Sequence, residues 1–242
     1  MNAPCPLDHI RIVLSHTSHP GNIGAAARAM KTMGLHSLYL INPRFFPDKE
    51  ADARAANASD ILEFAKVCTG LDEALENTVL TAAITARPRE LSHDVFDARQ
   101  GAHELLRYAQ QQPVALLFGR ENSGLTTAEV SKCQIIIHIP ANPQYPSLNL
   151  ASAVQIMSYE LRMTLTENAA PPAIRPSASF NELESLYAHL EELMIISNFL
   201  DPQKPKLLMQ RIRRLFSRAR LEKEEVQILR GILTALSKRR QT

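Results

Sequence analysis

The first 165 residues alternate short apolar runs with stretches of helical periodicity. Five of the runs have the length and composition of strands, at 10–16, 37–43, 78–85, 113–119 and 134–140. The last three are almost continuously apolar rather than alternating, which is typical of strands buried on both faces of a parallel sheet. Helical patterns separate or follow them, at 23–33, 71–77 and 148–165. The pattern therefore predicts an α/β fold with a mostly parallel sheet and helices on both faces.

Beyond this region the pattern changes to helices alone. The stretch ENAAPPAIRPSAS contains three prolines among small residues and is typical of a linker. Three helical patterns follow it, at 180–199, 205–219 and 222–238. The prediction is an α/β domain at 1–166, a linker at 167–179 and a small helical domain at 180–242.

Composition and charge sharpen this division. The chain has 242 residues, of which 45% are apolar, enough for one domain of about 160 residues and a smaller one. Residues 1–166 carry 14 basic and 16 acidic side chains, whereas residues 167–242 carry 13 basic and 9 acidic ones. The stretch PQKPKLLMQRIRRLFSRAR holds seven basic residues and no acidic one. A basic segment appended to a slightly acidic body indicates a contact surface for a polyanion.

Other classes of protein find little support. Cys5, Cys68 and Cys133 are scattered, so neither a zinc site nor a disulfide framework is expected. His16 and His19 have no third ligand nearby in the sequence, and no metal is expected. The start of the chain does not resemble a signal peptide, and no apolar run reaches the roughly 20 residues of a membrane span. We expect a cytoplasmic protein without a membrane partner.

The first candidate motif is SHPGNIGAAARAMKTMG, at 18–34, which follows a predicted strand and opens a helix. Its order suggests a dinucleotide loop, but Gly21 and Gly24 have the spacing GxxG rather than GxGxxG, and no acidic residue ends the second strand. A nicotinamide-linked oxidoreductase is therefore disfavoured. Asn22 is placed to cap the helix. Arg28 is either a solvated surface residue or part of a crowded site, because the helix is rich in alanine.

The second and third motifs also follow predicted strands. In LLFGRENSGLTTAEV the strand ends at Gly119, at the edge where open α/β sheets bind ligands, and Thr126 with Glu129 forms a capping box. The alternative is a polar loop held by its own Arg–Glu pair. In IPANPQYPSLNLASAVQ three prolines stiffen a loop, and either Ser147 or Asn149 is expected to cap the long helix that follows.

Together the three segments resemble the motifs of the SpoU branch of the SPOUT RNA methyltransferases, as N-x-G…R, GxExxGL and P…SLN. The match covers 10–165, and the linker and basic helices extend it toward members that methylate the ribose 2′-hydroxyl of a cytidine or uridine in the tRNA anticodon loop, expected at position 32. The resemblance implies S-adenosylmethionine as cofactor, tRNA as partner and a trefoil knot in the C-terminal half of the α/β domain. It also implies a homodimer whose active site is shared between subunits.

The resemblance also implies roles for individual residues. Arg28 would fix a phosphate and stabilise the attacking oxygen, Glu121 would orient Arg28 or Arg120, and Asn22 would set the first loop. Ser147 and Asn149 would bond the ribose or the cofactor carboxylate. The implied cofactor contacts are Ile84, Thr85, Ala86, Leu117, Gly119, Ile139, Pro146, Ser147, Leu148 and Asn149. The implied RNA contacts are Arg28, Arg120, Arg211, Arg213, Arg214 and Arg218. Pro146 departs from the small polar residue expected before Ser147, and a non-catalytic RNA-binding protein remains an alternative.

Overall fold

The computed structural model describes residues 5–86, 94–167 and 176–238. Within them, seven parallel strands form one sheet in the order β3-β2-β1-β6-β4-β7-β5. The strands are β1 (Ile10–Ser15), β2 (Ser37–Ile41), β3 (Lys66–Cys68), β4 (Leu80–Ile84), β5 (Asp94–Asp97), β6 (Val114–Phe118) and β7 (Ile135–His138). The predicted α/β fold with a parallel sheet is confirmed.

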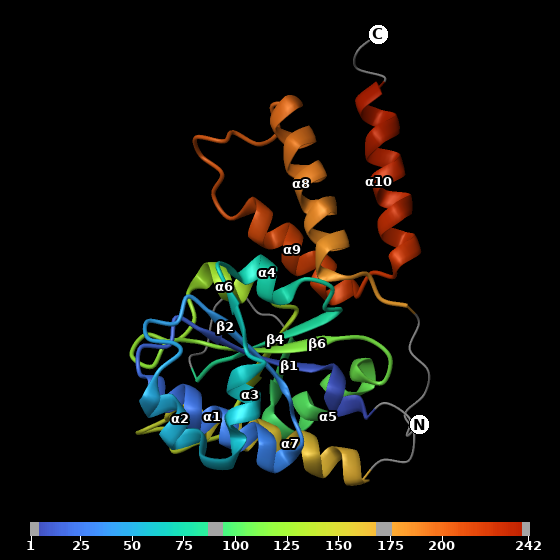
Figure 1. The fold of residues 1–242 in the computed structure, drawn as a ribbon. Helices are drawn as coiled ribbons and strands as arrows, with labels where there is room; N and C mark the ends of the chain where they lie inside the picture. The colour runs from blue at the N-terminus through green and yellow to red at the C-terminus, as the bar shows by residue number, and fades with distance from the viewer. Residues whose placement is uncertain (1–4, 87–93, 168–175, 239–242) are drawn as a thin grey trace.

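Helices cover both faces of the sheet (Figure 1). On one side lie α1 (Pro20–Met33), α2 (Lys49–Ala55), α3 (Ser59–Glu63), α5 (Ala98–Ala109) and α7 (Leu150–Glu167). On the other lie α4 (Leu71–Leu75) and α6 (Thr127–Ser131), and above them α8 (Phe180–Ile196), α9 (Leu208–Ala219) and α10 (Lys223–Lys238). Two 3₁₀ helices, Pro6–His9 and Ala56–Ala58, complete the elements.

The alternation of side chains along the strands divides the core in two. In β6, Leu116 and Phe118 join the cluster under α1, α5 and α7, whereas Ala115 and Leu117 join the cluster under α4 and α6. All four are buried, which explains why the run reads as continuously apolar.

The first helix begins earlier than predicted. It starts at Pro20, where the missing N–H of proline costs nothing, and its N-cap is His19. Asn22 therefore lies inside the first turn, and the prediction that it caps the helix is wrong. Gly24 faces α2, where an added Cβ would lie 2.0 Å from the carbonyl oxygen of Ala51. This glycine permits close helix packing and is not part of a phosphate-binding loop.

The C-terminal helices have a small core of their own, with Leu183, Leu186 and Tyr187 of α8 packed against Val226 of α10. They are also fastened to the α/β body. Phe180, the first residue of α8, is buried in the sheet's second cluster, and its N–H donates to the carbonyl of Thr78 at 2.7 Å. The division into two domains at residue 180 stays a prediction. Among the described helices, none combines the length and apolarity needed to cross a membrane.

Candidate active site

A pocket lies at the carboxyl edge of the sheet, where the neighbouring strands β6, β4 and β7 end. Its lining includes eight residues predicted as cofactor contacts, namely Ile84, Thr85, Ala86, Gly119, Ile139, Pro146, Ser147 and Leu148. The loop 120–124 and the start of α7 complete the wall. Parallel strands bring their carboxyl ends to one edge, so three loops far apart in sequence meet here.

Two predicted cofactor contacts lie elsewhere. The side chain of Leu117 is buried on the opposite face of the sheet, because side chains alternate along β6, and the pocket receives Phe118 instead. Asn149 does not line the pocket. Leu150 and Ala153 of α7 do line it and were not predicted, although their spacing of three residues places them on one helix face.

The loop after β6 is tight, and glycine is required at two of its positions. The backbone of Arg120 and Gly124 pairs in both directions, with N···O distances of 3.2 and 2.9 Å. An added Cβ on Gly119 would lie 2.2 Å from the carbonyl carbon of Gly124, and Gly124 itself has φ +68°. These two glycines let the loop fold back over the end of β6 and shape the pocket wall.

Glu121 holds the start of the first helix. Its carboxylate accepts hydrogen bonds from the N–H and hydroxyl of Ser18, the N–H of His19 and the side-chain amide of Asn22, all between 3.1 and 3.2 Å. Burial alone would raise the pKa of Glu121, but the hydrogen bonds from Asn22, Ser18 and His19 outweigh it and lower the pKa. Among the described residues its carboxylate bonds neither Arg28 nor Arg120, so the structure does not support the expectation that Glu121 orients one of them.

Asn22 extends this contact to the third motif. Its side-chain oxygen accepts a hydrogen bond of 3.0 Å from the amide of Asn149. The oxygen of Asn149 in turn accepts from the N–H of Ala151 at 2.9 Å, which confirms that one of the two polar candidates caps α7. The series Glu121–Asn22–Asn149 therefore joins all three motifs, and we refer to these residues as the interlock.

Arg120 forms an ion pair with the buried carboxylate of Glu129. Its guanidinium contacts Glu129 at 2.9 Å and the Nδ1 atom of His16 at 2.9 Å. Glu129 also accepts from the hydroxyl of Ser15 at 2.5 Å and the N–H of Thr126 at 2.6 Å, as the predicted capping box requires. Burial would raise the pKa of Glu129, but the hydrogen bonds from Ser15, Thr126 and Arg120 outweigh it and lower the pKa to about 2.

Arg28 stands apart from the pocket of its own chain. It lies on α1 with an exposed side chain and does not line the pocket. Within the described residues, no hydrogen bond or ion pair engages its guanidinium. The helix α1 packs against α2 and α7 on its other sides, so Arg28 faces away from this chain's own fold.

The arginines of α9 differ in their surroundings. Arg213 forms a two-point contact with the carboxylate of Glu184, one of the bonds measuring 2.8 Å, and its guanidinium lies 4.4 Å from the ring centre of Tyr187. The carboxylate of Glu184 neutralises its charge and joins α9 to α8, so the structure does not support its predicted role as an RNA contact. Arg214 is half-buried, whereas Arg211 and Arg218 are exposed.

The fold and pocket define an α/β protein with a candidate ligand site at the carboxyl edge of a parallel sheet. Comparison with family models is more specific: residues 9–159 match the SpoU rRNA methylase family, and residues 181–242 match the C-terminal domain of the tRNA methyltransferase TrmJ. The chain therefore belongs to the SpoU methylase family and, within it, to the TrmJ group.

Individual relatives are similar in sequence to this protein over nearly its whole length. The tRNA (cytidine/uridine/adenosine-2′-O-)-methyltransferase TrmJ of Pseudomonas aeruginosa is 46% identical, over 96% of this chain and 95% of its own. The tRNA (cytidine/uridine-2′-O-)-methyltransferase TrmJ of Yersinia enterocolitica is 46% identical over 96% of this chain and 93% of its own. The crystal structure of TrmJ from Z. mobilis has a TM-score of 0.84 at 32% identity and covers 94% of this chain and 98% of its own.

Proposed function

We propose that this protein transfers a methyl group from S-adenosylmethionine to the ribose 2′-hydroxyl of a cytidine or uridine in tRNA, with position 32 of the anticodon loop as the target. Both relatives described above are named as tRNA 2′-O-methyltransferases of cytidine and uridine, and the first also of adenosine. The observation that carries the proposal for this chain is the interlock. It ties the first helix, the loop after β6 and the start of α7 around one pocket.

The pocket suits S-adenosylmethionine in its chemistry. Ile84, Ile139 and Leu148 offer apolar surface for the adenine ring. Ser123 and Ser147 line the same pocket and would offer polar groups to the edges of the base and ribose. When bound, this cofactor would supply a methyl group on a positively charged sulfur. An oxygen nucleophile can attack the methyl carbon in line, with the sulfur as the leaving group.

We also propose a trefoil knot around this pocket, as the family resemblance implies. The strand β7 lies between β4 and β5, and the chain then continues through the proline-containing loop into α7, beneath the sheet. The crystal structure of the Z. mobilis protein has the same overall fold. A knotted loop keeps the pocket walls in place without a ligand, which lowers the entropy lost on binding.

Arg28 is proposed to complete the site of a second subunit. Its exposed guanidinium faces away from its own fold, and Ala25 and Ala29 leave little side-chain bulk beside it on α1. A homodimer packed through α1 and α7 would bring Arg28 to the partner's pocket. The interlock then has a second purpose, because it fixes the helix that carries Arg28.

The chemistry follows from what a guanidinium can do. It stays protonated near neutral pH, so Arg28 would donate hydrogen bonds to the phosphate beside the target nucleotide and to the 2′-oxygen. Its positive charge would stabilise the negative charge that develops on this oxygen as its proton passes to solvent water. Ser147, at the pocket wall, would bond the ribose or the cofactor carboxylate. A cytoplasmic location, which we also propose, fits a tRNA substrate.

The proposal is tested by transfer of a labelled methyl group. The purified protein is incubated with labelled S-adenosylmethionine and unmodified tRNA, and label in the RNA is counted. We expect incorporation by the wild type and none after Arg28→Ala. Mixing Arg28→Ala with a Ser147→Ala variant that is inactive alone should restore part of the activity, because Ser147 lines the pocket and is not part of the interlock, so one site of the mixed dimer is intact. Absence of label with the wild type refutes the proposal, and absence of recovery refutes the shared site.

A further inference from the structure

The loop between α8 and α9 exposes an aromatic ring that the fold does not use. Phe199 is 71% exposed. It follows Asn198, which ends α8 in the left-handed conformation, and its N–H closes the helix by donating to the carbonyl of Met194 at 2.9 Å. The next residue, Leu200, is buried, whereas the ring of Phe199 is left at the surface. The ring of Phe199 is therefore not needed to end the helix.

Positive charge surrounds this ring. Phe199 shares a surface depression with Leu207 and with the cations Lys204, Lys206 and Arg211. Across the described residues, no carboxylate forms an ion pair with any of these three cations. Asp201 also borders the depression. One of its carboxylate oxygens accepts a hydrogen bond from the N–H of Gln203 at 2.8 Å, and its single negative charge faces three cations.

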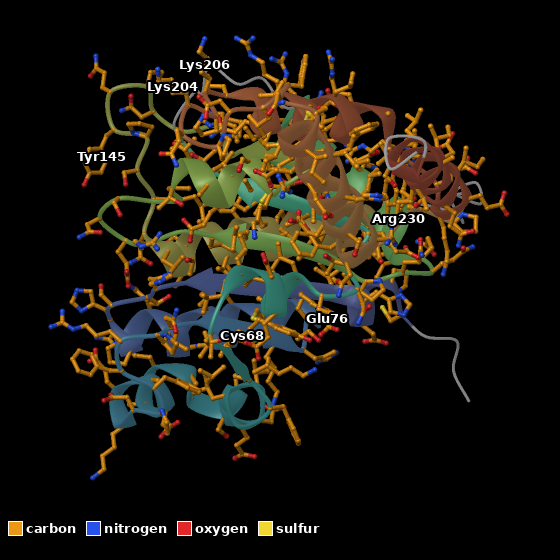
Figure 2. The ribbon with its side chains drawn as sticks, turned by 90° about the horizontal axis from the view of Figure 1, so that it is seen from above. Cys68, Glu76, Tyr145, Lys204, Lys206 and Arg230 are labelled. Carbon is orange, nitrogen blue, oxygen red and sulfur yellow. The ribbon has the colours of Figure 1, made fainter. Side chains whose placement is uncertain are left out.

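The loop between α8 and α9 lies on the same side of the molecule as the pocket (Figure 1). In Figure 1 it projects from the helical region toward the side on which the strands end and the pocket opens. Figure 2 shows Lys204 and Lys206 on the same side of the molecule as Tyr145, which belongs to the third motif. A substrate held at the pocket would pass along this side of the molecule.

We infer that the depression around Phe199 is a binding subsite for an unpaired nucleotide of the RNA substrate. The ring stacks on the base, and Lys204, Lys206 and Arg211 contact the flanking phosphates. An exposed aromatic beside a basic groove is how proteins hold single-stranded nucleic acid, because every base presents a face on which a ring can stack. The inference rests on the proposed function, in which the substrate is a tRNA with unpaired loops.

The alternative occupant of a basic surface with an exposed ring is an anionic membrane surface. A membrane contact requires a continuous apolar face beside its cations. Here the ring stands in a depression with charges around it, which suits a flat base better.

The test is tRNA binding by the full-length protein, measured by fluorescence anisotropy across a salt series. Phe199→Ala should weaken binding about 10-fold, and Phe199→Tyr should recover to within about twofold, because stacking on one base contributes strongly to affinity. Replacing both Lys204 and Lys206 by Ala should lower the slope of log K against log salt by about 1.4, as expected for two lost contacts to a single strand. Phe199→Ala should leave this slope unchanged.

The matched control is Ile228→Ala on α10, whose side chain is 63% exposed and lies outside the depression; it should bind tRNA like the wild type. Binding to vesicles of phosphatidylglycerol and phosphatidylcholine is measured alongside. Unchanged tRNA affinity after Phe199→Ala overturns the inference, and lost vesicle binding in that variant would assign the depression to a membrane instead. In either case a wild type that still methylates tRNA leaves the proposed function standing. A wild type that neither binds nor methylates tRNA refutes the proposed function itself.

Discussion

Replacing Glu121 by Gln tests whether the interlock positions the first helix for catalysis. The carboxylate accepts bonds from Ser18, His19 and Asn22, all of which are donors. An amide in its place turns one oxygen into a donor that faces the same groups, and it removes the charge at the start of α1. At least one charge-assisted bond is lost and the others become neutral, at about 1–3 kcal/mol each.

Because Glu121 is half-exposed, water can replace part of the hydrogen bonding that the substitution removes. We therefore expect a cost of about 2 kcal/mol, since screened contacts retain only part of their value. If this cost falls on the position of α1 during methyl transfer, kcat drops about 30-fold. The cofactor affinity should fall less than kcat, because the hydrogen bonds that Glu121 accepts all come from the first motif, although its side chain also borders the pocket.

The assay is steady-state methyl transfer to unmodified tRNA at saturating cofactor, with thermal unfolding measured alongside. Glu63→Gln is the matched control, since Glu63 is an exposed glutamate on α3, away from the pocket, and it should leave both measurements unchanged. A Glu121→Gln variant with wild-type kcat would show that the interlock does not position the catalytic machinery.

The remaining predictions concern three other sites. Arg28→Ala should abolish turnover while calorimetry shows nearly unchanged cofactor binding, since Arg28 is not part of its own pocket. Arg213→Ala should lower the melting temperature and leave the salt dependence of tRNA binding unchanged, because its charge is bound to Glu184; Arg211→Ala should do the reverse. Glu129→Gln should cost about 3 kcal/mol in urea unfolding at pH 7, since the folded-state pKa lies near 2 against an ordinary value of 4.5.

The pH dependence of the Glu129 effect has a definite sign. A carboxyl whose pKa is lowered by folding stabilises the protein fully above the unfolded pKa, and this contribution is lost as the pH falls from about 4.5 toward 2. The difference between Glu129→Gln and the wild type should shrink to about 1 kcal/mol at pH 3. A difference of equal size at pH 7 and pH 3 would contradict the lowered pKa of Glu129. Near-normal turnover of Arg28→Ala would contradict its catalytic role, and an unchanged melting temperature of Arg213→Ala would contradict its structural role.

The strands of the sheet could be predicted from sequence because burial on both faces leaves a direct trace in composition. The run at 113–119 is continuously apolar for this reason, and the prediction for β6 is confirmed. The edge strands β3 and β5 were missed, because each is short and partly exposed and so lacks that trace. The helix α5 was also missed, although its polar and apolar residues alternate with helical spacing.

Within the site, local signals were readable and distant partners were not. The capping box at Thr126 depends only on residues three positions apart, and it is confirmed. The partners of Asn22 are 99 and 127 residues away, so its role in the interlock required the fold. The burial of Leu117 behind the sheet follows from strand alternation, which the sequence contains. The fate of Arg213 depends on Glu184 and Tyr187 in another helix, which no periodicity within α9 reveals.

The most direct test of the account is mass spectrometry of the nucleosides released from tRNA after reaction with S-adenosylmethionine. Ribose methylation adds its mass to the sugar, whereas base methylation adds it to the base, so fragmentation of each nucleoside distinguishes the two. The account predicts 2′-O-methylcytidine or 2′-O-methyluridine among the nucleosides, found in the nuclease fragment that contains position 32 and absent with Arg28→Ala. A methyl group on a base, or a tRNA left unmodified by a protein that binds the cofactor, would contradict it.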